Sequence, residues 1–305
     1  KDSGKTWTSF RGKIPGMPLG SWIPQIRASR YNAGEVFVVC NDYRRSNFAP
    51  YIFRTKNYGQ TWERMIDEKK VTGYALCLIQ DPVEPNLIFV GTENGLWVSF
   101  DNGNNFQQWK NDYPSVSTYD MAIQEREADL VVATFGRAIY IFDDIRPLRK
   151  AASNNGVLFS KKLTLFQAPV AYMANYRPET GYDWSSWGLY EGENRHSGAP
   201  YSYFIKPTEK KDAPKNMKAD SATVKIYDKD NELIRTLKMK VDTGFNRNSW
   251  GFEMKGIRRP GSPKPKPNSQ EPGGVAVFPG TYKLVMLVGK ETDSTMIVVK
   301  EDPNV

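Results

Sequence analysis

The chain has 305 residues, of which 39% are apolar and 25% are charged, and its net charge is +8. This composition excludes a disordered chain and suffices for one large or two ordinary domains with real cores. Because the sequence contains only 1 histidine, histidine-based metal sites and Ser-His-Asp or Cys-His catalysis are nearly excluded within it. Aromatic residues reach 13%, which favours sheets over helices.

The excess positive charge lies mainly in two proline-rich stretches, 206–218 and 255–266. Neither has interleaved aromatic residues, so both are interpreted as solvated loops rather than as a nucleic-acid surface. No apolar run reaches the length of a membrane span. Cys40 and Cys77 lie in apolar runs and are interpreted as buried core residues, although their spacing leaves a disulfide open.

Residues 1–10 are predicted to form a turn followed by a strand at 6–10, the last strand of an incomplete repeat. Because the chain opens inside this repeat, we expect the protein to extend upstream. A targeting segment would then lie outside the sequence.

Three further groups of predicted strands follow a Gly/Pro-rich connection at 12–20. The first group has strands at 23–29, 35–40, 51–55 and 62–66. The second has strands at 75–80, 87–91, 96–100 and 106–109. The third has strands at 119–124, 130–134 and 138–142 and lacks a fourth.

An octamer with the pattern S/T-x-D/N-x-G-x-x-W/F recurs after β-rich runs. The acidic or amide side chain caps backbone N–H groups of a tight turn, and the glycine adopts a left-handed conformation. The aromatic ring then packs into the layer beneath the turn. The pattern positions in the three copies are Asp2, Gly4 and Trp7; Asn57, Gly59 and Trp62; and Asp101, Gly103 and Phe106.

Four short strands per repeat of about 40–45 residues are typical of a β-propeller blade. Three blades cannot close a ring, so we expect the remaining blades upstream or on another chain. A propeller commonly closes by completing its last blade with a strand from the other end of the chain, and the three-stranded last blade is consistent with such closure. The predicted fold class is therefore all-β, with about three blades of a larger propeller over residues 1–148.

Residues 149–200 show little periodicity and are interpreted as a connecting, loop-rich segment. Residues 201–305 then give a second β region, which we interpret as an immunoglobulin-like β-sandwich. Its predicted strands lie at 201–206, 222–228, 233–239, 248–253, 280–288 and 294–300.

The octamers resemble the Asp-box (BNR) repeats of sialidases and sortilin-type propellers. The runs 22–45 and 129–144 are similar to the large bacterial sortilin-like repeat proteins, a group often labelled glycosyl hydrolases. The segments 192–203, 244–250 and 279–282 resemble the β-sandwich that follows the propeller in that group. The resemblance implies an exported, extracytoplasmic bacterial protein. Asn57 and Phe106 depart mildly from the usual Asp and Trp.

Each octamer is predicted to join the third and outermost strands of a blade, so its role is interpreted as structural. The opposite face, made by the turns between second and third strands, is where we predict a ligand. The predicted ligand-binding residues there are Asp42, Arg44, Arg45, Asn94, Tyr119 and Arg137. The alternative is that these charges form salt bridges that seal neighbouring blades.

Catalysis by a glycoside hydrolase requires a pair of carboxylates. No motif singles out such a pair, and Glu93 and Asp120 are weak candidates. Trp184, Trp187 and Tyr190 suit either a carbohydrate platform or the anchoring of a long loop. His196 is interpreted as a loop residue in solvent.

Two functions are consistent with this sequence. The favoured one is a non-enzymatic binding or scaffold module that contacts a protein or a glycan, without a metal or cofactor and without nucleic acid. The alternative is an exported glycoside hydrolase with carboxylates on the ligand face. Membership of a multichain surface complex is a third interpretation.

Overall fold

The structure is a computed structural model that describes residues 4–10, 12–153, 160–174, 197–207, 221–258, 260–261 and 269–303. The chain divides into two compact units, Lys1–Leu158 and Phe159–Val305. Among the described residues, no helix combines the length and apolar character needed to cross a bilayer.

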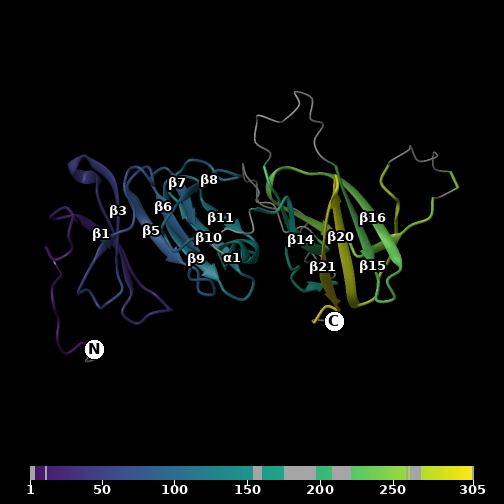
Figure 1. The fold of residues 1–305 in the computed structure, drawn as a ribbon, viewed down its shortest axis with the longest axis horizontal. Helices are drawn as coiled ribbons and strands as arrows, with labels where there is room; N and C mark the ends of the chain where they lie inside the picture. The colour runs from purple at the N-terminus through teal and green to yellow at the C-terminus, as the bar shows by residue number, and fades with distance from the viewer. Residues whose placement is uncertain are drawn as a thin grey trace, which may run out of the picture. The chain divides into compact units, whose positions relative to one another are not determined.

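The first unit consists of three antiparallel sheets whose strands follow one another in chain order (Figure 1). The first sheet contains β1 (Trp22–Ala28), β2 (Val36–Asp42), β3 (Asn47–Thr55) and β4 (Glu63–Arg64). The second contains β5 (Ala75–Gln80), β6 (Ile88–Thr92), β7 (Gly95–Ser99) and β8 (Gln107–Trp109). The third contains β9 (Thr118–Gln124), β10 (Asp129–Thr134) and β11 (Ile139–Phe142). These are blades of a partial β-propeller, and the predicted fold class is confirmed.

One predicted strand is wrong. Residues 6–10 form no strand, because the described residues offer them no neighbouring strand to complete a hydrogen-bonded ladder. Trp7 instead donates its indole N–H to the carbonyl of Gly4 at 3.0 Å, and Phe10 packs edge-on against Trp62.

Apolar side chains from facing sheets form the core between the first two blades. Phe37, Val39 and Ile52 of the first blade pack with Leu78 and Val90 of the second. Both faces of these strands are covered, which explains why the strands are apolar at successive positions instead of alternating. The predicted connection at 12–20 covers the other face of the first blade, where Ile14 packs with Cys40, Tyr51 and Phe53.

The octamers form the turns between β3 and β4 and between β7 and β8. In the first, the Thr55 hydroxyl accepts from the N–H of Gly59 at 2.9 Å, and Asn57 Oδ1 accepts from the N–H of Thr61 at 2.9 Å. In the second, Ser99 and Asp101 accept the equivalent bonds from Gly103 and Asn105 at 2.8 and 2.9 Å. Gly59 and Gly103 have φ of 84° and 83°, the left-handed region that glycine adopts without strain.

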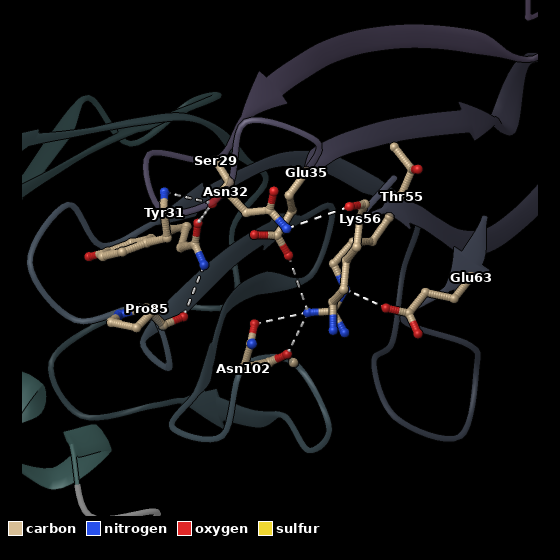
Figure 2. A network of polar contacts seen from close by, with 12 residues as sticks. Ser29, Tyr31, Asn32, Glu35, Thr55, Lys56, Glu63, Pro85 and Asn102 are labelled. Carbon is tan, nitrogen blue, oxygen red and sulfur yellow. Dashed lines mark hydrogen bonds and ion pairs between the residues drawn. The ribbon is translucent and has the colours of Figure 1, made fainter. Parts of the chain in front are cut away.

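A buried arginine links the first blade to the second octamer turn. Arg54 of β3 donates to the carbonyl and side-chain oxygens of Asn102 at 3.0 and 2.9 Å. The same guanidinium pairs with Glu63 and lies 4.0 Å from Glu35. Figure 2 shows Glu35, Glu63 and Asn102 converging on this point.

A short helix, α1 (Arg146–Ser153), follows the third blade in the sequence, in place of a fourth strand in chain order. Arg149 of α1 donates its Nε–H to both carboxylate oxygens of the fully buried Asp81, at 3.0 and 2.9 Å. Asp81 also accepts from the backbone N–H groups of Val83 and Glu84. This carboxylate therefore joins the helix to the turn between β5 and β6.

The second unit is a β-sandwich. One sheet has the order β12-β14-β17, and the other has the order β13-β21-β20-β15-β16. The strands of the first sheet are β12 (Leu163–Leu165), β14 (Ala199–Ile205) and β17 (Gly244–Trp250). Those of the second are β13 (Ala171–Tyr172), β15 (Ser221–Tyr227), β16 (Leu233–Lys240), β20 (Gly280–Val288) and β21 (Glu291–Lys300). β18 (Glu253–Lys255) and β19 (Gly273–Ala276) form a separate hairpin.

Tyr201 and Trp250 from one sheet pack with Val224, Leu284 and Ile297 from the other, so the core lies between the two sheets. β12 and β13 fall inside 149–200, the range predicted to be a connecting segment. β12 pairs with β14, and β13 pairs in parallel with β21. Strands of 3 and 2 residues are too short to show a period in the sequence, which is why sequence reasoning missed them.

Candidate ligand-binding site

The strand register places the octamer turns and the predicted ligand residues at opposite ends of the first blade. Trp22 pairs with Asn41 at one end of β1 and β2, while Ala28 pairs with Val36 at the other end. Val36 in turn pairs with Thr55, where the octamer begins. The turn between β2 and β3, formed by the 3-10 helix η1 (Tyr43–Arg45), therefore lies at the end away from the octamer.

Two hollows open at this end of the first unit. The larger hollow, of about 590 Å³, is lined by residues that include Trp22, Arg27, Asn41, Arg44, Tyr119 and Asp120. The smaller hollow, of about 400 Å³, is lined by residues that include Gly20, Trp22, Asn41, Asp42, Arg44 and Arg45. Trp22, Asn41 and Arg44 belong to both linings, so they form the wall that the two hollows share.

Arg44 is held in the wall by aromatic rings. Its guanidinium carbon lies 4.7 Å from the centre of the Tyr43 ring and 5.5 Å from that of the Trp22 ring. Tyr43 stacks on Tyr74 with ring centres 4.5 Å apart, which fixes the platform beneath the cation. Among the described residues, Arg44 has no ion pair.

The other charges that line the hollows are paired. Asp42 accepts from Nε of Arg45 at 2.6 Å, and Arg45 also donates to the carbonyl of Leu19 at 2.6 Å. Arg27 lies 3.7 Å from Asp120 and donates to the carbonyl of Met121 at 3.2 Å. The second pair joins the first blade to the third, whereas the salt-bridge alternative concerned neighbouring blades and did not include Arg27.

Asn41 is 1% exposed and carries an unsatisfied acceptor. Its amide donates to the carbonyl of Ala75 at 3.1 Å, whereas Oδ1 has no hydrogen-bond partner among the described residues and no solvent contact. An acceptor buried in this way costs about 1–3 kcal/mol. A donor that reached it when the wall residues moved would recover that energy.

Aromatic rings surround the hollows. Trp22 is 60% exposed and Tyr119 is 54% exposed, and Tyr119 lies 6.0 Å from the ring of Phe135. Burial raises the pKa of the Tyr74 phenol, and the nearby Glu93 carboxylate raises it further. Glu93 lies next to Tyr74, since its backbone N–H donates to the Tyr74 carbonyl at 3.1 Å.

The structure brings together only part of the predicted ligand-binding set. Asp42, Arg44, Arg45 and Tyr119, together with the weak catalytic candidate Asp120, line the hollows. Glu93, Asn94 and Arg137 are not among the described residues that line either one. The backbone of Glu93 and Asn94 is used in turns: the Glu93 carbonyl accepts from Ser117, and the Asn94 carbonyl accepts from Gln108 and Ser115.

Arg137 is exposed in the turn between β10 and β11. Asp2 and the residues Trp184, Trp187, Tyr190 and His196 lie outside the described residues, so their predicted roles stay predictions.

Sequence reasoning did not single out Trp22, Asn41 or Tyr74 as ligand-binding residues. Trp22 and Tyr74 each precede a predicted strand, whereas Asn41 follows the predicted strand 35–40 and opens the turn that was placed on the ligand face. An indole just before an innermost strand was the available signal, because that position lies at the blade end where the ligand is predicted. Among the described residues, no group of His, Cys, Asp and Glu could hold a metal ion.

No protein-family model matches the chain, and no curated protein matches it significantly. Solved structures similar to it include a GH74 enzyme from Niastella koreensis, with 14% identity, a TM-score of 0.35, and coverage of 60% of this chain and 28% of that one. A GH74 xyloglucanase from Xanthomonas campestris has 12% identity and a TM-score of 0.33, with coverage of 89% and 38%.

The extracellular domain of a hybrid two-component system from B. thetaiotaomicron has 11% identity and a TM-score of 0.28, with coverage of 92% and 31%. The chain spans well under half the length of each of these three structures.

Proposed function

We propose that this chain is part of a non-enzymatic binding module, and that its ligand is a carbohydrate bound at the two hollows. The observation that carries the proposal is the shared wall, where an unpaired guanidinium lies over part of an exposed indole ring. A pyranose ring offers an apolar face for stacking and a rim of hydroxyl groups that accept from arginine.

A carbohydrate suits this site better than a protein segment does. Hollows of about 590 and 400 Å³ lie within the range of small-molecule sites, which is roughly 300–1,000 Å³. In such sites aromatic rings supply most of the contact area, and a few polar groups fix the orientation of the ligand.

Binding is favoured over hydrolysis because of the carboxylates. Asp120 is the one carboxylate among the described residues that line the larger hollow, and it is paired with Arg27. Asp42 lines the smaller hollow and is engaged by Arg45. Hydrolysis of a glycosidic bond requires an acid and a base or nucleophile about 5–10 Å apart.

The proposal includes three wider expectations. The chain would belong to the bacterial sortilin-like Asp-box group, would be exported, and would complete its propeller with blades upstream or on another chain. Their support is the resemblance in the sequence, together with the octamer turns whose side chains and glycines repeat one hydrogen-bond pattern.

A Trp22→Ala variant tests the proposed site. We expect the wild-type chain to bind members of a glycan array, and the variant to lose affinity about tenfold or more, which corresponds to about 1.4 kcal/mol. Isothermal titration with the best array member measures the loss. Trp7→Ala is the matched control, because Trp7 is 90% exposed in a different turn and lines neither hollow.

Equal affinity of the wild-type chain and Trp22→Ala would place the ligand elsewhere. Binding to proteins but to no glycan would overturn the carbohydrate assignment. Release of reducing ends by the wild-type chain, lost in Asp120→Asn, would replace the binding module with a hydrolase.

A further inference from the structure

We infer that the carbohydrate bound at this site is acidic, with a hexuronate carboxylate paired to Arg44. The inference rests on the proposed function and names the class of glycan. It follows from the charges of the two hollows and from the position of Arg44 in the wall between them. Among the described residues, no carboxylate forms an ion pair with this arginine.

The described linings contain three arginines and two aspartates. Arg45 is paired with Asp42 at 2.6 Å, and Arg27 is paired with Asp120 at 3.7 Å. One positive charge therefore remains, and it is that of Arg44. A cation without a counterion at the wall of a hollow attracts an anion, and Arg44 is exposed, so an anion can reach it.

The guanidinium of Arg44 is preorganised to bind a planar carboxylate. The rings of Tyr43 and Trp22 hold the guanidinium in place at 4.7 and 5.5 Å from their centres, so binding immobilises little additional side chain. A guanidinium offers parallel N–H donors that match both oxygens of a carboxylate. An ammonium or an amide at this position would not form the same bidentate pair of hydrogen bonds with a carboxylate.

The two hollows have the same balance of charged residues in their linings. Arg27 and Arg44 stand against Asp120 in the larger hollow, and Arg44 and Arg45 stand against Asp42 in the smaller one. Because Arg44 belongs to both linings, the carboxylate can reach it from either hollow, and a neutral part of the glycan would occupy the other.

The stacking surface is consistent with this placement. Trp22 lines both hollows and is 60% exposed, so part of its ring remains available although Arg44 lies over it. A sugar bound against this ring has its substituents directed toward the same wall. The chain of sugars would then cross the wall, with its acidic group on the side of Arg44.

A matched pair of probes tests the inference: trigalacturonate and its fully methyl-esterified form, which keeps the sugar framework and removes the charge. We expect the wild-type chain to bind the acid about tenfold tighter than the ester, since hydrogen bonds to a charged group are the strong ones. Isothermal titration at low and at raised salt measures both affinities, and salt should weaken only the binding of the acid.

The Arg44→Gln variant should bind acid and ester with equal affinity. Arg44 is exposed, so this variant is expected to fold, and its melting temperature checks that it does. Arg126→Gln is the matched control, because it removes the same charge from a turn that lines neither hollow, and it should keep the tenfold preference.

The outcomes separate the inference from the proposed function. A wild-type chain that binds neutral array glycans through Trp22 but shows no preference for acid over ester would overturn the acidic class and leave the binding function intact. A chain that binds no glycan at all would overturn both. A preference for the acid that survives in Arg44→Gln would remove Arg44 from the site.

Discussion

Arg54 shows how a single buried residue can connect two blades. It is 6% exposed, and its guanidinium satisfies two oxygens of Asn102 in the next blade while lying between Glu35 and Glu63. Asn102 has φ of 56°, a left-handed conformation that is unusual for a residue with a side chain. The hydrogen bonds from Arg54 help to hold that turn in place.

An Arg54→Met variant should lose about 3–5 kcal/mol of unfolding free energy, because it leaves the buried carboxylate of Glu35 without its counterion and the oxygens of Asn102 without a donor. Urea denaturation measures the change. Arg126→Met is the control, since Arg126 is exposed and its one ion pair among the described residues is with its neighbour Glu127, so it should change stability by less than about 1 kcal/mol. A loss in Arg54→Met no larger than the control's would mean that the blades do not depend on this link.

The two cysteines are free and buried. We therefore expect the stability of the fold to decrease at alkaline pH. Burial raises the pKa of the Cys40 thiol from 9.0 to about 12. Below pH 9 the thiol is neutral in both states, and its contribution to stability is complete. As the pH rises from 9 toward 12, the unfolded chain releases this proton and the folded chain retains it, so stability falls.

The slope of unfolding free energy against pH in this range should be shallower in Cys40→Ala than in the wild-type chain, by up to about 1.4 kcal/mol per pH unit. Urea midpoints at pH 8, 9.5 and 10.5 measure it. Val38→Ala, a change at a buried neighbour that does not titrate, should lower stability equally at every pH. Parallel slopes for Cys40→Ala and the wild-type chain would contradict the prediction.

At the scale of the element, the octamer turn is where each blade contacts the preceding repeat. A Cβ on Gly59 would lie 2.5 Å from the ring of Phe10, and a Cβ on Gly103 would lie 2.4 Å from the end of Met65. Phe10 and Met65 both stand three residues after the tryptophan of their own octamer. The glycine therefore allows the turn to adopt its backbone conformation and also leaves room for the side chain of the previous repeat.

The second and third blades approach each other closely at Gly91 of β6. A Cβ there would lie 2.6 Å from the backbone oxygen of Thr118 and 2.5 Å from Sγ of Cys77. Since a backbone atom cannot move aside as a flexible side chain does, Gly91→Ala should cost about 1–3 kcal/mol or more. Thermal unfolding followed by circular dichroism measures the loss.

Gly251→Ala serves as its control, because the nearest atom to a Cβ there is 3.7 Å away, an ordinary contact distance. An effect of Gly91→Ala as small as that of Gly251→Ala would show that the two sheets can separate without cost.

At the scale of the whole molecule, the first unit has a strand face with exposed apolar side chains. The core of the second unit lies between its own two sheets. In the first unit, by contrast, Ile139 and Ile141 of β11 are 64% and 60% exposed. They pair with Ala133 and Val131 and lie on one face of the third blade. Another blade would cover such a face.

A fragment comprising residues 159–305 should therefore fold cooperatively by itself, whereas one comprising 1–158 should self-associate through its exposed face. Calorimetry and sedimentation velocity on the two fragments measure these properties. The double variant Ile139→Thr and Ile141→Thr should reduce self-association of the 1–158 fragment without lowering its melting temperature, because both side chains are already in solvent. A fragment of 159–305 that does not unfold cooperatively would show that its core depends on the rest of the chain.

The sequence by itself determined the all-β class, the blade repeat, the turn chemistry of the octamers and the end of the blade where charged residues gather. These features are local: a short apolar run bounded by turn residues, a glycine that needs a left-handed backbone, and side chains that cap their own turn all act within a few residues. Arg44, Asp42 and Tyr119 could be selected for the same reason, since the alternation of strands and turns fixes the end at which each lies.

Only the tertiary structure decided which of these residues share a site. Asp120 meets Arg27 across 93 positions of sequence, and Arg54 meets Asn102 across 48. Nothing local marks those distant partners, so the sequence could not separate the paired arginines from Arg44, which is left without a carboxylate. It also could not show that Trp22 and Asn41 become the wall between two hollows, because that wall exists only where β1, β2 and the η1 turn meet.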